Sequence, residues 1–203
     1  MSMQPQAVAL VIVDISGYTA FIRSNRATLG HAQEAIAQLL ESVIDKADHP
    51  LTLNKLEGDA AFLFARLENE GEAAARDVMR QVAGFFPAFH DRARSLARSR
   101  ENCPCGACRA ILDLKLKAIV HAGEAAFRRI RQFEELTGED VIVAHRLLKN
   151  SVTLPEYVLM TEAFHRLLAD FDDSAGETRI EACDELGNVP VRVLAATADY
   201  FAT

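Results

Sequence analysis

The sequence has no surplus of positive charge, because 22 lysine and arginine residues stand against 29 aspartate and glutamate residues, a formal net charge of −7. Binding to nucleic acid or to an anionic membrane requires a net basic surface, so the composition argues against both partners. No apolar run approaches the about 20 residues of a transmembrane helix. The first residues, MSMQPQ, also lack the basic region and apolar stretch of a signal peptide. These absences predict a cytoplasmic protein.

Cysteine is scarce, and three of the four cysteines are crowded into Cys103, Cys105 and Cys108. This distribution suits a reducing compartment better than a disulfide framework spread along the chain. The sequence also lacks an internal repeat, a low-complexity tract and a linker. We therefore expect residues 1–203 to form a single domain with one polar, cysteine-containing insertion around residues 99–110.

The first half of the chain alternates between strand and helix patterns. Residues 7–13 form a short apolar, β-branched run typical of a central strand. Helical spacing follows at 18–22 and 32–44. Two extended segments within 49–67 meet at Glu57, Gly58 and Asp59. This pattern predicts a β-hairpin, because Gly and Asp tolerate the backbone conformations of a tight turn. Helical spacing returns over 71–99, where Pro87 is expected to kink the helix or to begin a second one.

The second half predicts further strands and short helices. Residues 112–120 alternate as a half-buried strand does, and the segment RRIRQFEEL is expected to pair beside it. A helix is predicted from Gly138, a strand at 157–160, and a short helix around residues 164–167. The C-terminal segment predicts a hairpin with Gly187 and Asn188 at its turn. Half of the residues are apolar, and the periodicity by itself indicates a packed, mixed α/β fold.

Two carboxylates stand where a strand and a hairpin end. Asp14 follows the first apolar run, in VIVDISGYTAF, and Asp59 lies at the turn of KLEGDAAFLF. Brought to one edge of a sheet, the pair would suit Mg²⁺ and could build a site for phosphoryl chemistry. Each residue alone is equally typical of a helix cap or an ordinary Gly-Asp turn.

Four motifs resemble the class III adenylate and guanylate cyclases in order and spacing. DISGYTAF resembles the first strand motif of that family, and KLEGDA resembles its Lys-x-x-Gly-Asp hairpin. LKAIVHAGEA resembles a later strand ending in His-x-Gly, where His121 is expected to satisfy turn or core hydrogen bonds. GEDVIVAHRL resembles the helix that begins Gly-x-x-Val-Asn. Together the motifs cover residues 8–149.

The resemblance implies a fold and a dimer. The fold is an α/β (α+β) sandwich of ferredoxin-like type, with a mostly antiparallel sheet and helices packed on one face. Catalytic domains of the family act as head-to-tail homodimers, because the metal-binding aspartates come from one subunit and the Lys, Asn and Arg from the other. This chain carries residues of both sets, so a homodimer with two sites is implied.

The resemblance also implies roles for individual residues. Asp14 and Asp59, helped by the backbone carbonyl of Ile15, would hold Mg²⁺ or Mn²⁺. Lys55 and Glu135 stand where adenylate cyclases use Lys and Asp to recognise the base. A Lys donor with a carboxylate acceptor matches N1 and N6 of adenine, so ATP is favoured over GTP. A plain salt bridge between the two residues remains an equal alternative.

The residues implied to act on the transition state are incomplete. Arg146 aligns with the arginine that stabilises charge on the transferring phosphate, although an exposed helical arginine is the alternative. Ile142 stands where the family has an Asn that orients the ribose. The last hairpin contains no lysine for the terminal phosphates, and Arg192 is the only cation near that position. Each lost contact would cost about 10²–10³ in rate.

We therefore predict a cyclase-like domain that binds a purine nucleotide through a divalent metal, with weak or lost cyclase activity. Two other interpretations stay open. The chain could be a regulatory or protein-interaction module on the same fold, or an active adenylate cyclase. A metal-dependent phosphoryl hydrolase with Asp14 as nucleophile is the weakest interpretation, since the usual second Asp is replaced by Ser16.

The cysteine cluster is a separate candidate site. Cys103, Cys105 and Cys108 offer three thiolates, and the intervening Gly and Pro favour sharp turns. Tetrahedral zinc requires a fourth ligand, which we expect to be Cys183, His90, His121 or a residue of a partner chain. A surface loop with reduced thiols and a redox pair of Cys105 with Cys108 are the alternatives to structural Zn²⁺.

Overall fold

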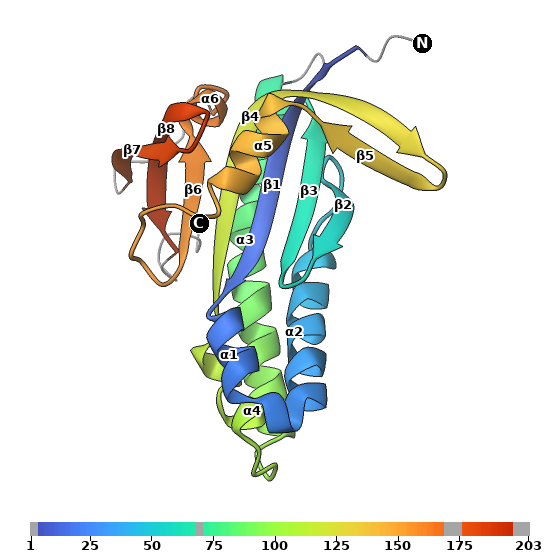
Figure 1. Cartoon of the computed structure of the whole chain (residues 1–203), viewed down its shortest axis with the longest axis vertical. Helices are drawn as coiled ribbons and strands as arrows, with labels where there is room; N and C mark the ends of the chain where they lie inside the picture. Colours follow the sequence, from blue (N-terminus) through green and yellow to red (C-terminus); the bar gives the residue numbers. More distant parts are fainter. Residues whose placement is uncertain (1–3, 68–70, 169–175, 197–203) are drawn as a thin grey trace.

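The computed structural model describes residues 4–67, 71–168 and 176–196, which form one mixed sheet flanked by helices (Figure 1). The strand order is β2-β3-β1-β4-β6-β8-β7, with β5 paired to β4. Only β4 and β6 pair in parallel among these strands. The strands are β1 (Gln6–Ser16), β2 (Thr52–Glu57), β3 (Ala60–Arg66), β4 (Lys115–Ile130), β5 (Phe133–Thr137), β6 (Tyr157–Thr161), β7 (Glu177–Cys183) and β8 (Gly187–Ala195).

The long helices cover one face of this sheet and extend beyond its lower end (Figure 1). The helices are α1 (Tyr18–Ser24), α2 (Leu29–Ile44), α3 (Gly71–Ser99), α4 (Gly106–Arg109), α5 (Glu139–Arg146) and α6 (Glu162–His165), with 3₁₀ turns η1 (Arg26–Thr28) and η2 (Ile111–Asp113). Neither α3 nor any other helix within the described ranges is both long and apolar enough to cross a bilayer.

The two faces of β1 build two separate cores. Val11 and Val13 face the cluster formed by α2 and α3, whereas Leu10 and Ile12 face a smaller cluster that includes α5. This alternation explains why the run is apolar throughout, since both faces of the strand are buried. The mostly antiparallel sheet and the helical layer confirm the predicted fold class. The short helix α5 lies on the face opposite α2 and α3, so helices cover both faces unequally.

The structure decides two local expectations. Helix α3 continues through Pro87 as one helix of 29 residues, so of the two expected effects of Pro87 the start of a second helix is excluded. In the C-terminal hairpin, Gly187 and Asn188 pair with β7 rather than form the turn. The turn lies one step earlier, at 184–186, where Glu185 adopts a positive φ of 68° and Gly187 follows with 81°. A Gly-Asn pair therefore closes the turn instead of standing at its centre.

A buried histidine anchors the start of α5. His121 on β4 contacts Thr161 Oγ1 at 2.9 Å and Asp140 Oδ1 at 3.0 Å, and Asp140 also accepts a bond from the Glu124 amide. Burial lowers the pKa of His121 despite the neighbouring carboxylate. The predicted structural role of His121 is thus confirmed.

Gly123 allows this anchor to form, and its replacement by alanine should destabilise the fold. A Cβ at position 123 would lie 2.1 Å from Asp140 Cγ, so the carboxylate would have to leave its partners. We expect Gly123→Ala to lower the free energy of unfolding by about 2–3 kcal/mol, as overpacking and a lost buried hydrogen bond do. Urea denaturation measures the effect.

Gly84→Ala is the matched control for this variant. Gly84 lies within α3, and a Cβ there meets no atom within 4 Å. Alanine at this position should stabilise the protein by about 0.4–1 kcal/mol, mainly by restricting the unfolded chain. Equal stability of the Gly123→Ala and Gly84→Ala variants would contradict the anchoring role of Gly123.

Candidate functional site

The two predicted carboxylates lie side by side at one end of the sheet. The backbone amide of Ile15 donates to the carbonyl of Asp59 over 3.2 Å, and Asp14 pairs in register with Ala60. Burial, followed by the charge of Asp14, raises the pKa of Asp59 to about 6, and the two carboxyl groups are close enough to share a hydrogen bond. Gly58 holds a left-handed φ of 69° in the turn that presents Asp59.

Lys117 is a neighbour of this pair that the sequence did not reveal. It lies opposite Asp14 in the register of β1 and β4, with Nζ 3.0 Å from Asp14 Oδ2. Both side chains are more than four-fifths buried, at 18% and 17% exposure. Lys117 also donates to the carbonyl of Leu148 at 3.3 Å. Its charge offsets one of the two carboxylates, so the pair is only partly neutralised within the chain.

Lys55 and Glu135 meet as the resemblance implied. Lys55 Nζ lies 3.6 Å from Glu135 Oε2, although the residues are far apart in the sequence. The β4–β5 hairpin is fastened over β2 by a bond from Asn54 Nδ2 to the carbonyl of Glu134 at 2.8 Å. Both residues of the ion pair line a small pocket of about 170 Å³ that also includes Phe133.

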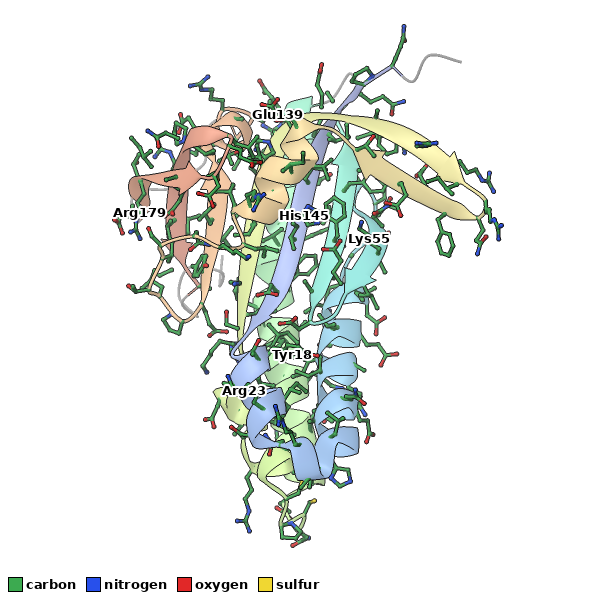
Figure 2. The ribbon with its side chains drawn as sticks, in the orientation of Figure 1. Tyr18, Arg23, Lys55, Glu139, His145 and Arg179 are labelled. Carbon is green, nitrogen blue, oxygen red and sulfur yellow. The ribbon has the colours of Figure 1, made fainter. Side chains whose placement is uncertain are left out.

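A second polar network continues from Lys55 toward α5. Glu57 accepts from Lys55 at 3.3 Å and contacts His145 Nε2 at 3.0 Å. Phe62 packs against both side chains, with its ring centroid 4.9 Å from that of His145 and 5.9 Å from Lys55 Nζ. Figure 2 shows Lys55 and His145 on the same side of the sheet, one from β2 and the other from α5.

Of the residues implied to act on the transition state, Arg146 and Ile142 are exposed on α5 and Arg192 lies on β8. Arg146 is exposed and forms no ion pair with another described residue. Ile142 lies on the same helix with 51% of its surface exposed. Arg192 on β8 contacts Glu162 Oε2 at 3.4 Å. Within one chain, the described contacts do not bring Arg146 to the two carboxylates.

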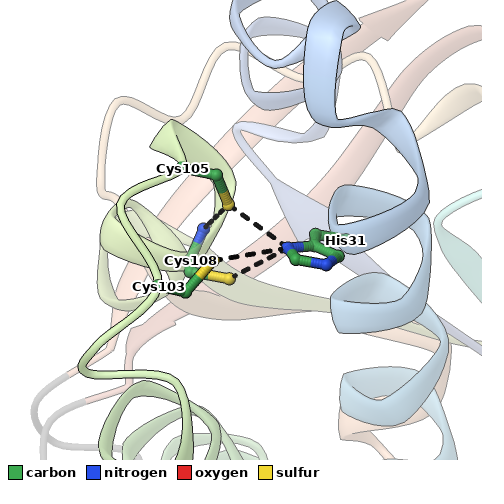
Figure 3. Close-up of side chains that lie close together, drawn as sticks. All are labelled: His31, Cys103, Cys105 and Cys108. Carbon is green, nitrogen blue, oxygen red and sulfur yellow. Dashed lines mark hydrogen bonds between the residues drawn. The ribbon is translucent and has the colours of Figure 1, made fainter.

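The three clustered cysteines converge on His31, a residue for which the sequence offered no signal. Its Nδ1 lies 3.4 Å from Cys105 Sγ and 3.6 Å from the sulfurs of both Cys103 and Cys108 (Figure 3). We call these four residues the Cys/His cluster. A bond from the Cys108 amide lowers the pKa of Cys105 to about 6.

The three candidates named within this chain for the fourth ligand lie outside the cluster. His121 is bound by Thr161 and Asp140, and His90 contacts Glu156 at 2.9 Å. Cys183 lies at the end of β7, away from the cluster. His31 is 72 residues before Cys103, and no spacing rule connects two segments that far apart.

A protein-family model matches residues 36–157, more than half of the chain. The chain belongs to the family described as protein of unknown function DUF2652. A relative in Mycobacterium tuberculosis, named uncharacterized protein Rv2561/Rv2562, is 38% identical over 133 residues, which cover 66% of this chain. The match spans 60% of the length of that relative.

Solved structures of class III adenylyl and guanylyl cyclases share the fold. The guanylyl cyclase Cya2 superposes with a TM-score of 0.72 at 14% identity, covering 98% of both chains. A class III adenylyl cyclase-like ATP-binding protein from Pseudomonas aeruginosa gives a TM-score of 0.65 at 14% identity, covering 82% of this chain and 35% of the other. The resemblance of this member of the DUF2652 family to the cyclase fold is thereby confirmed.

Proposed function

We propose that this protein binds a purine nucleotide, with ATP favoured, through a divalent cation held by Asp14 and Asp59, and that it has weak or no cyclase activity. The observation that carries the proposal is the convergence of the two carboxylates at the end of β1. Their oxygens are the hard donors that Mg²⁺ and Mn²⁺ prefer. Burial and mutual repulsion raise the pKa of Asp59, and a cation between the groups would relieve that repulsion.

The Lys55–Glu135 pair supports the choice of adenine. A lysine donor and a carboxylate acceptor complement N1 and the N6 amino group of adenine, and present the wrong pattern to guanine. Asn54 is among the residues that line the same pocket, and its Oδ1 is a buried atom without a hydrogen-bond partner among the described residues. An acceptor of this kind could receive an amino group of the base.

The small size of the base pocket supports a homodimer. Its volume of about 170 Å³ lies below the about 300–1,000 Å³ of typical ligand pockets, so one chain offers only part of a site. Phe133, which lines the pocket, and Ile142 on α5 leave 60% and 51% of their surfaces exposed. In a head-to-tail pair, the exposed Arg146 would serve the carboxylates of the other copy.

Weak turnover follows from the exposed face of α5. Ile142 has no group that can hydrogen-bond a ribose, and Arg192 contacts Glu162. Two missing contacts, each worth about 10²–10³ in rate, leave little catalysis. A reducing cytoplasm, which supplies ATP and keeps the four free cysteines reduced, is the compartment that this proposal favours.

Calorimetric titration with ATP and GTP, in Mg²⁺ or Mn²⁺, followed by product analysis, tests the proposal. We expect ATP to bind about fivefold more tightly than GTP, the ratio that one net hydrogen bond of about 1 kcal/mol gives. Cyclic nucleotide should stay near background. Lys55→Gln should remove the preference, and Lys46→Gln, which alters an exposed lysine outside the site, should not. Absence of metal-dependent nucleotide binding would contradict the proposal, and robust cyclic product would contradict its catalytic half.

A further inference from the structure

The Cys/His cluster lies at the end of the molecule remote from the sheet. His31 stands in the first turn of α2, and the three cysteines come from the loop that follows α3 and from α4. Figure 1 shows α4 at the lower end of the molecule, beside the lower ends of the long helices α2 and α3. The cluster is therefore distinct from the proposed nucleotide site at the end of β1.

Hydrogen bonding does not account for three sulfurs around one nitrogen. A histidine Nδ1 carries either one proton or one lone pair, so it can make one good hydrogen bond. Here Nδ1 has three sulfur neighbours at 3.4–3.6 Å. All four cysteines of the chain are free, so disulfides do not explain the convergence.

Tetrahedral zinc does account for these distances. With Zn–S of about 2.3 Å and Zn–N of about 2.0–2.1 Å, the N···S edge of a tetrahedron is about 3.6 Å. The three measured separations match this edge, and all four ligand atoms lie within 4.8 Å of one another. Three thiolates and one imidazole are also the soft donors that favour zinc over Mg²⁺.

The surrounding backbone orients the ligands. Cys105 caps α4, and its sulfur accepts a bond from the Cys108 amide at 3.4 Å. Gly106 packs so closely on buried Asn25 that a Cβ would lie 2.6 Å from Asn25 Oδ1. Arg100 donates to the carbonyl of His31 and pairs with Glu34 at 2.9 Å. These contacts resemble the outer partners that fix ligands at metal sites.

We propose that the Cys/His cluster holds one structural zinc ion that fastens the start of α2 to the loop after α3. Four protein ligands leave no open position for a substrate, so the site is structural rather than catalytic. The loop after α3 is polar and has little apolar surface to bury. Metal coordination would therefore supply the stabilisation that a hydrophobic core supplies elsewhere. Because α1 and η1 connect β1 to this point, the ion would also fix the segment that follows Asp14.

Elemental analysis of untagged protein, purified without chelator, tests the proposal. We expect about one zinc ion per chain. Replacement by Co²⁺ should give the intense visible bands of a tetrahedral, thiolate-bound ion. Both measurements use the wild-type protein, so they do not depend on whether a variant folds. Metal-free protein with no cobalt spectrum, or one equivalent of iron in place of zinc, would overturn the assignment. So would a Cys105–Cys108 disulfide in protein kept under reducing conditions.

Variants then assign the ligands. His31→Ala and Cys105→Ser should lose zinc and lower Tm by at least about 4 °C. Cys183→Ala, which removes a buried cysteine outside the cluster, should retain the zinc. Asp59→Asn should also retain it, so this proposal and the nucleotide site succeed or fail separately. Full zinc content in both His31→Ala and Cys105→Ser would overturn the ligand set.

Discussion

Replacement of Asp59 by asparagine is expected to abolish metal-dependent nucleotide binding while stabilising the protein in the absence of added divalent cation. Loss of a direct carboxylate ligand should cost more than the about 10–100-fold that loss of a supporting residue costs. The loss is measured by titrating ATP in the presence of Mn²⁺. Asp113→Asn removes an exposed carboxylate of η2 and should bind ATP as the wild type does.

The stabilising half of this prediction follows from the pKa of Asp59. Folding raises that pKa from 3.8 to about 6, so the folded state binds the proton more tightly than the unfolded chain. Stability from this group is therefore complete below pH 3.8 and is lost as the pH rises through 6. At pH 7.5 asparagine removes the penalty, which partial solvent exposure reduces to about 1 kcal/mol.

Thermal denaturation without added divalent cation measures this gain. A stabilisation of about 1 kcal/mol should raise the Tm of a domain of this size by about 2–4 °C at pH 7.5, and the gain should shrink as the pH approaches 4. Unchanged ATP binding by Asp59→Asn would refute the two-carboxylate site. A lower Tm at pH 7.5 would show instead that burial and the charge of Asp14 do not destabilise the ionised Asp59 carboxylate in the folded state.

The Ile142→Asn variant is expected to gain cyclase activity. Ile142 lies on α5 with half of its surface exposed, so the exchange should change stability by no more than about 0.5 kcal/mol. An asparagine there restores the amide that the cyclase resemblance implies for the ribose. One such contact is worth about 10²–10³ in rate, and we expect a gain of about 10² because the phosphate-binding lysine is still missing.

Cyclic AMP production from ATP and Mn²⁺ measures the gain, with Ile142→Ala as the matched control. Alanine removes the exposed apolar side chain without adding a hydrogen-bonding group, so its activity should stay at the wild-type level. Equal activity of the Asn and Ala variants would show that position 142 does not limit turnover. The low cyclase activity would then be due to the C-terminal hairpin around Arg192.

The elements were predictable where the periodicity was strong. Residues 8–13 are apolar at every position because both faces of β1 are buried there. The Glu57–Asp59 turn was predictable because glycine adopts the backbone conformations that a tight turn needs. Pro87 was harder, because a helix packed along its whole apolar face tolerates one missing hydrogen bond. The C-terminal turn was misplaced because Glu185 adopts the left-handed conformation that the Gly-Asn pair was expected to supply.

Contacts between distant segments were not predictable from spacing. Lys117 belongs to an alternating strand, which places it on the face opposite Leu116 and Ala118, but its pairing with Asp14 depends on the register of β1 against β4. His31 reaches the cysteines only because α2 packs against α3. The spacing of residues in a single sequence does not predict that packing. Lys55 and Glu135 were paired correctly only because the cyclase resemblance supplied the correspondence.

Lys117 has a consequence for how the protein would respond to its surroundings. Its ammonium group already balances part of the negative charge at the end of β1, so the domain does not depend on a dication for its integrity there. If Asp14 and Asp59 bind metal and nucleotide as proposed, their occupancy would then rise and fall with the supply of both while the protein stays folded. A zinc ion at the opposite tip would behave differently, as a permanent component acquired once, during folding.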